Sequence, residues 1–215
     1  MKNYIKVPQD IEKRSFEIIG EELGDKKNKF DDTTLPIIKR VIHTTADFEY
    51  ADLIEFRNDP VSHAMKALKD GCKIYCDTNM IVNGLSKIVL SKFNCSADCY
   101  VSDPEVTKEA KERGITRSIV GMEKAGKDKN TKIFLIGNAP TALYKLKEMI
   151  ENNEIEKPEL VVGVPVGFVG AAESKDVFKE LDVPYITVNG RKGGSTVAVS
   201  ILHGILYQMY KREGF

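Results

Sequence analysis

The sequence lacks the features by which several classes of protein are recognised. It has no tryptophan, only four cysteines and three histidines among 215 residues, and its 32 basic side chains are balanced by 32 acidic ones. Because a duplex-binding domain neutralises phosphates with an excess of lysine and arginine, a zero net charge argues against a nucleic-acid partner. The remaining composition, 42% hydrophobic and 30% charged, is typical of a globular chain and excludes a disordered one.

Long hydrophobic runs are missing as well. The first 19 residues carry a charge every few positions and contain no apolar core of a secretory signal. The longest stretch without a charge, residues 193–210, includes glycine, serine, threonine, histidine and glutamine, which favours a buried helix over a membrane span. We therefore expect a cytoplasmic protein without a membrane partner.

The few cysteines fit no familiar ligand pattern. They are spaced as Cys72-x3-Cys76 and Cys95-x3-Cys99, which matches neither the C-x2-C of zinc knuckles nor a redox C-x-x-C motif. In a reducing compartment they are expected to be buried free thiols, and the alternative is a cluster of four thiolates around a metal. We expect no metal.

The second half of the chain alternates short β-branched runs with longer amphipathic stretches, as in parallel strands joined by crossover helices. Five strands are expected, at Lys73–Cys76, Ala97–Val101, Lys132–Ile136, Leu160–Val164 and Tyr185–Val188. The expected helices are Pro60–Asp70, Met80–Ser91, Pro104–Arg113, Arg117–Ala125, Ala139–Asn152, Ser174–Leu181 and a last one from about Ser195 to Lys211. The predicted fold class is α/β, three layers α/β/α around a mostly parallel five-stranded sheet.

No linker rich in proline, glycine or serine divides the chain, and no repeat recurs at a fixed period. We expect one domain over residues 1–215, in which residues 1–50 form a helical extension laid on the α/β core.

Ligands of open parallel sheets bind beyond the carboxyl ends of the strands. The loop after the last expected strand brings Arg191, Lys192, Gly193, Gly194 and Ser195 to the start of a helix, where backbone N–H groups bind anions. The sequence therefore predicts an anion site there, although two glycines after a strand are also typical of a tight turn.

Nucleotide-binding signatures are missing. The chain has no Walker A loop, and Gly163-x3-Gly167-x2-Gly170 departs from the dinucleotide spacing G-x-G-x-x-G. A nucleotide-dependent enzyme is therefore the weakest of the alternatives that we keep.

Of the three histidines, His43 is the candidate for chemistry. His203 falls in the apolar last helix and is expected to be packed or at an interface, and His63 is expected to be solvated or to cap a helix. On a helix beginning at Leu35, Arg40 and His43 project together from the side opposite the apolar positions. His43 is then either plainly exposed or faces a cleft built by another element, where it could donate or accept a proton near neutral pH.

Several stretches together resemble one protein family, the precorrin-8X and cobalt-precorrin-8 methylmutases of cobalamin (vitamin B12) biosynthesis. The matching segments are Ile11-Glu-Lys-Arg-Ser-Phe-Glu-Ile-Ile19, Arg40-Val-Ile-His43, Cys76-Asp-Thr-Asn-Met80 with Asn83-Gly84, Thr116-Arg117-Ser118, Ile136-Gly-Asn-Ala-Pro-Thr-Ala-Leu143, Val164-Pro-Val-Gly-Phe-Val-Gly-Ala-Ala-Glu-Ser-Lys175 and Gly190-Arg-Lys-Gly-Gly-Ser195. They extend over nearly the whole chain.

The resemblance implies an isomerase that moves a methyl group from C11 to C12 of a corrin precursor, a 1,5-sigmatropic shift, with no added cofactor. It implies that His43 is the catalytic histidine and that Ser15, Arg40, Ser86 and Arg117 contact the substrate. Cobalt, where present, would be carried by the substrate.

Such a substrate carries several carboxylates around a flat apolar ring. Arg40, Arg117, Arg191 and the helix start at Gly193–Ser195 would bind those carboxylates. The resemblance also implies a homodimer, and the apolar last helix is expected to be shared between the monomer core and the dimer contact. The alternative from another class is a non-catalytic carrier that binds the same polycarboxylate and passes it on.

Overall fold

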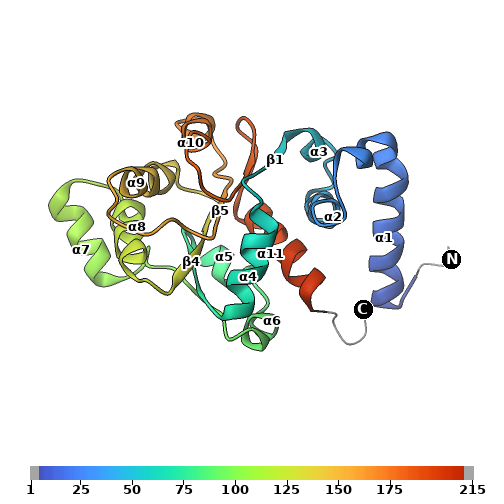
Figure 1. Cartoon of the computed structure of the whole chain (residues 1–215), viewed down its shortest axis with the longest axis horizontal. Coiled ribbons are helices and arrows are strands. Elements are labelled where there is room, and N and C mark those ends of the chain that lie inside the picture. The colour runs from blue at the N-terminus through green and yellow to red at the C-terminus, as the bar shows by residue number, and fades with distance from the viewer. Residues whose placement is uncertain (1–4, 211–215) are drawn as a thin grey trace.

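The computed structural model describes residues 5–210 and shows a six-stranded sheet with helices on both faces (Figure 1). The strands are β1 (Ile54–Arg57), β2 (Lys73–Cys76), β3 (Ser96–Asp98), β4 (Thr131–Ile136), β5 (Leu160–Gly163) and β6 (Tyr185–Val188). Their order across the sheet is β1-β6-β5-β4-β2-β3, and all neighbours are parallel except β1 and β6. This architecture confirms the predicted α/β class.

The central strands are buried on both faces. Every residue of β5 and β6 is buried, and both are short runs rich in valine, isoleucine and other apolar side chains. Strands covered by helices on both sides require such continuous apolar runs, since neither face meets water.

The helices are α1 (Pro8–Leu23), the 3₁₀ helix η1 (Gly24–Lys29), α2 (Leu35–Thr45), α3 (Tyr50–Leu53), α4 (Pro60–Asp70), α5 (Asn79–Gly84), α6 (Lys87–Lys92), α7 (Pro104–Arg113), α8 (Arg117–Lys127), α9 (Pro140–Glu151), α10 (Ala171–Phe178) and α11 (Ser195–Met209). Most begin and end close to the predicted positions, but α10 begins and ends earlier than the predicted Ser174–Leu181, because the chain turns into the helix directly after Gly170, which adopts φ 74°. The boundaries follow local chemistry. Asp103 caps the start of α7, Gly114 ends it with φ 64°, and Thr116 caps α8.

Two apolar clusters lie on opposite faces of the sheet. One is formed with α2, α4, α5, α6 and α11, and the other with α8, α9 and α10. The N-terminal extension lies at one end of the molecule, where α2 packs on α11 and α1 packs outside α2 (Figure 1). The face that carries α2 and α11 also carries the candidate site.

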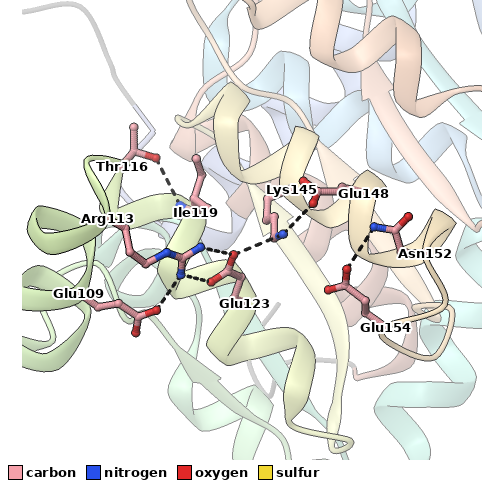
Figure 2. Close-up of polar contacts among 9 residues, drawn as sticks. All are labelled: Glu109, Arg113, Thr116, Ile119, Glu123, Lys145, Glu148, Asn152 and Glu154. Atoms are coloured by element: carbon pink, nitrogen blue, oxygen red, sulfur yellow. Dashed lines mark hydrogen bonds and ion pairs between the residues drawn. The ribbon is translucent and has the colours of Figure 1, made fainter.

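At the other end of the molecule, ion pairs join α7, α8 and α9 (Figure 2). Arg113 contacts Glu109 on its own helix and Glu123 on α8, and Lys145 on α9 contacts Glu123 at 3.3 Å and Glu148 at 3.0 Å. Because Glu123 is shared by two cations, it links α8 to both α7 and α9.

The sheet has one strand more than the five predicted. β1 pairs antiparallel with β6, from Ile54 opposite Val188 to Arg57 opposite Tyr185. The sequence gives little sign of this strand, because Glu55 and Arg57 interrupt its apolar residues and it lies at the sheet edge, where polar side chains are tolerated.

The predicted helix Met80–Ser91 is in fact two helices. Helix α5 ends at Gly84, and the Ser86 side chain accepts a hydrogen bond from the Val89 N–H at 3.4 Å to begin α6. The Ser86 N–H donates to His203 on α11 at 3.1 Å, so a distant side chain stabilises the break. The last helix was predicted to reach Lys211, which lies outside the described residues.

Candidate active site

Helix α2 separates its apolar and polar faces as its sequence predicts. Ile37, Ile38, Val41 and Ile42 are buried, and Arg40 and His43 project from the other side. Because the buried residues fix the helix against α11, they also fix the direction in which the Arg40 and His43 side chains extend.

A cavity of about 300 Å³ opens beside these two side chains. Its walls come from three helices that are distant in the sequence. Helix α2 contributes Arg40, His43 and Thr44, α5 contributes Met80 and Gly84, and α11 contributes Ser195, Thr196, Val199, Ser200, His203 and Tyr207. Its size lies at the low end of the range for small-molecule sites.

His43 is exposed and lines this cavity. Its ring lies 5.1 Å from that of Phe16 on α1, measured between centroids. Of the two alternatives left open by the sequence, plain exposure or a position facing a cleft built by another element, the structure shows the second, with the ring still reachable from solvent.

Arg40 is held by three neighbours. Its guanidinium lies over the Phe16 ring at 4.7 Å and over the Tyr207 ring at 4.9 Å, and its Nη1 contacts Glu12 Oε1 at 2.7 Å. Stacking between two aromatic rings fixes the plane of the guanidinium, the geometry that suits a carboxylate partner.

The start of α11 also lines the cavity. Ser195 Oγ lies 3.0 Å from Thr78 Oγ1, and Thr78 caps α5, so the two hydroxyls join the starts of both helices. Gly193 and Gly194 adopt φ of 151° and 124°, and the Gly194 N–H donates to the Val164 carbonyl at 2.9 Å. A Cβ on Gly193 would lie 2.2 Å from that same oxygen, so a residue with a side chain does not fit at this position.

The two cations of this loop do not converge on the helix start. Lys192 Nζ contacts Asp47 and lies 2.6 Å from Glu49, and these hydrogen bonds raise the pKa of Lys192. The Arg191 guanidinium lies over the exposed Phe168 ring at 5.4 Å. The loop is therefore a tight turn, and the predicted gathering of Arg191, Lys192 and free N–H groups at one point is not seen.

Asp77 holds a second loop at the same edge of the sheet. Its buried carboxylate accepts N–H bonds from Gly137, Asn138 and Ala139 at 3.0, 2.8 and 2.6 Å. Burial raises the pKa of Asp77, and the three N–H donors oppose that rise. A buried carboxylate with three donors fixes the loop that approaches Ser195, where a Cβ on Gly137 would meet the Ser195 Cα at 2.8 Å.

Comparison with known proteins gives a consistent result. Residues 10–208 match the family model described as precorrin-8X methylmutase. The chain belongs to the precorrin-8X methylmutase family. It is accordingly a methylmutase, an isomerase of corrin biosynthesis within the cobalamin pathway.

Individual relatives agree with the family. A protein named cobalt-precorrin-8 methylmutase from Priestia megaterium is 46% identical, over 92% of this chain and 87% of its own. One of the same name from Leptospira interrogans is 41% identical over 99% of both chains. A crystal structure of precorrin-8x methyl mutase from Thermus thermophilus matches with a TM-score of 0.83 and 36% identity, over 91% of this chain and 95% of that one.

The substrate contacts that the family resemblance implied lie in different places. Ser15, on α1, donates its hydroxyl hydrogen bond to the Ile11 carbonyl at 2.8 Å. Ser86 begins α6 and contacts His203 through its N–H. Arg117 is the exposed first residue of α8, which lies toward the opposite end of the molecule from α2 (Figure 1). Of the predicted site residues, His43, Arg40 and Ser195 line one cavity. The others do not line it, namely Ser15, Ser86, Arg117, Arg191, Gly193 and Gly194.

Sequence reasoning missed His203 as part of the cavity wall. Its Nε2 accepts the Ser86 N–H, and its ring stacks on Tyr207 at 4.9 Å. Ser195, Val199 and His203 follow one another at intervals of four along α11 and share a face, a signal that the strongly apolar helix obscured.

The four cysteines are free, and three of them are buried. Cys72 and Cys95 directly precede the neighbouring parallel strands β2 and β3, and their sulfurs lie 4.0 Å apart. Within residues 5–210 no group of three or more potential ligands is placed to hold a metal ion. In the same range no helix is long and apolar enough to cross a membrane.

Proposed function

We propose that the enzyme moves a methyl group from C11 to C12 of precorrin-8, with or without cobalt in the ring, and so forms cobyrinate or its metal-free counterpart. The names of the relatives support this substrate. The observation that carries the proposal is the placement of His43 beside Arg40 in a cavity that the start of α11 also lines.

The methyl shift requires few catalytic groups. A 1,5-sigmatropic shift changes no oxidation state and transfers nothing to water, so it requires an oriented macrocycle and a proton rather than a nucleophile or a methyl donor. We assign the proton to His43, acting as a general acid on a ring nitrogen next to the migrating centre. Such catalysis typically contributes about 10²–10⁴-fold.

Arg40 is proposed to bind a substrate carboxylate, and Ser195 is proposed to bind a second polar group in the same cavity. Ser15, Ser86, Arg117, Arg191, Gly193 and Gly194 stay predicted contacts. A ring with substituents on every side extends beyond a cavity of about 300 Å³, so groups at its rim belong in the proposal.

No resident cofactor is part of the proposal, and cobalt is treated as a component of the substrate. We propose that the protein works in the cytoplasm as a homodimer. Four free cysteines suit a reducing compartment. Apolar side chains left exposed on α1 and in the loop after β5 suit a protein that associates with a second copy.

The decisive experiment replaces His43 with alanine and follows the absorption change from substrate to product. Because only the proton donor is removed, kcat is expected to fall by about 10²–10⁴-fold while binding of cobyrinate changes little. His63→Ala is the matched control, since His63 is exposed on α4 and contacts Glu159 at 2.9 Å. Full activity of His43→Ala would exclude His43 as the acid.

The same assay separates the substrate forms when metal-free and cobalt-loaded precorrin-8 are compared. If His43→Ala slows only the metal-free reaction, the charge of the cobalt ion replaces the proton. Wild-type protein that binds cobyrinate but accelerates neither reaction would favour the carrier alternative.

A further inference from the structure

The Glu12 carboxylate already occupies Arg40, the arginine that we assign to the substrate. The two side chains contact at 2.7 Å, and each is only 20% exposed. This pair is therefore better shielded from solvent than most of the ion pairs on the surface of the chain. A shielded guanidinium without a partner would cost free energy. Arg40 therefore releases Glu12 only when another carboxylate takes its place.

Arg40 stands between two cavities. It lines the cavity that contains His43, and it also lines a second cavity of about 320 Å³ on its other side, between α1, α2 and α11. Tyr207 lines both as well. Of the described residues around either cavity, Arg40 is the one arginine, so a carboxylate entering from either side meets the same guanidinium.

Glu12 lies on the weakly anchored half of its helix. The buried residues of α1 are Ile19 and Leu23, in its C-terminal half. Ile11, which directly precedes Glu12, is 45% exposed, and Val7, just before the start of α1, is 50% exposed. Within one chain this half of α1 is therefore held to α2 by the contact between Glu12 and Arg40 and, one turn later, by the Phe16 ring, so release of Glu12 removes one of few contacts.

We propose that Glu12 is an internal stand-in for a substrate carboxylate: it holds Arg40 in the free enzyme and is displaced when the corrin precursor binds. This inference rests on the proposed function. Glu12 keeps the guanidinium paired and oriented between Phe16 and Tyr207, and its competition lowers the affinity for every ligand that must replace it. Ligands that lack a carboxylate at the matching position gain nothing to offset the lost pair, so the contact also selects for polycarboxylates.

The structure allows a second arrangement, in which the pair persists in the complex and only anchors α1. The two predict opposite effects of Glu12→Gln, an isosteric change that removes the charge. A displaced Glu12 predicts tighter substrate binding in the variant. A persistent Glu12 predicts unchanged or weaker binding, because α1 loses an anchor and nothing is gained.

The probe is cobyrinate, titrated into wild-type protein and variants by following the corrinoid absorption band. We expect Glu12→Gln to lower the Kd by about tenfold, which corresponds to about 1.4 kcal/mol. Cobyrinate with its carboxylates methylated should show no such gain. Glu17→Gln, on the same helix but paired with the exposed Arg14, is the matched control. It should leave the Kd for cobyrinate and the Kd for its methylated form unchanged.

Each result of these measurements either supports the inference or overturns it. An equal or higher Kd of Glu12→Gln for cobyrinate, with a wild-type melting temperature, overturns the inference and leaves the proposed function intact. Should that variant unfold, hydrogen exchange of α1 in the wild-type protein replaces it, and faster exchange around Glu12 on addition of cobyrinate is the expected result while unchanged exchange overturns the inference. Wild-type protein that does not bind cobyrinate overturns the inference together with the proposed function.

Discussion

At the scale of single residues, the most unusual side chain outside the cavity is Lys175. It is fully buried on α10, and its ammonium donates to the Lys192 carbonyl at 2.9 Å. Lys192 in turn contacts Asp47 and Glu49 in the segment that follows α2. Lys175 therefore fixes the loop before α11 from beneath and links it indirectly to the helix that carries His43.

Burial lowers the pKa of Lys175 to about 8. Between that value and its ordinary value of 10.5 the unfolded chain binds more protons than the folded one, so this group makes stability rise with pH across that interval. Relative to Lys175→Met, the free energy of unfolding of the wild type should rise by up to about 3 kcal/mol, because each tenfold change in proton affinity is worth roughly 1.4 kcal/mol.

Urea denaturation at several pH values from about 7 to 11, which bracket both pKa values, measures this difference. Lys66→Met, on the exposed face of α4, is the control and should follow the wild-type dependence. Parallel curves for wild type and Lys175→Met would show that the buried ammonium does not titrate in this range.

At the scale of elements, the cavity depends on how closely α2 and α11 approach. Gly204 lies at their crossing, where a Cβ would meet the Ile37 Cα at 2.8 Å. Because that Cα belongs to the backbone of a packed helix, it cannot give way unless the two helices separate. The distance between His43 on α2 and His203 on α11 follows from this approach.

Gly204→Ala is expected to lower the free energy of unfolding by about 2 kcal/mol and to reduce activity by widening the cavity. Gly20→Ala, within α1, is the matched control, since its Cβ would meet only the flexible end of Lys39 and alanine favours the helix by about 1 kcal/mol. Chemical denaturation compares the two variants, and a Gly204→Ala protein as stable as the control would contradict this view of the crossing.

Most helices and strands were predicted correctly because capping residues and apolar periodicity can be read from neighbouring positions in the sequence. The same periodicity placed Arg40 and His43 on the face of α2 that is turned away from the core. It could not supply the partners of that face, since Phe16, Glu12 and Tyr207 come from other helices, brought together only by the fold. The edge strand β1 and the break at Ser86 escaped prediction because each depends on a distant residue.

At the scale of the whole molecule, the two apolar clusters share one sheet, and we propose that residues 1–215 act as one domain. Several apolar side chains stay exposed near α1 and in the loop after β5. Ile11 and Ile18 on α1 are 45% and 37% exposed, and Val7 just before it is 50% exposed. Phe168 and Val169, after β5, are 82% and 90% exposed. Exposed apolar side chains in such numbers favour association with a second copy.

Light scattering at micromolar concentration is expected to give twice the 24.0 kDa of one chain. Replacing Ile11 and Ile18 together with lysine should shift the protein toward the monomer, because two charges then face the partner. Glu17→Lys, at a polar position of the same helix, should not. A wild-type protein with the mass of a single chain would refute the dimer.

The pairing of α2 with α11 has a consequence for the order in which the protein is made. The whole sheet lies between the two helices in the sequence, so α2 can pack early against α1 and α3 but lacks its most extensive partner until α11 has left the ribosome. A nascent chain can complete its strands first and acquires its cavity last. Chains that end before α11 are thus expected to bind chaperones through Ile37 and the apolar residues near it, and not to bind tetrapyrroles.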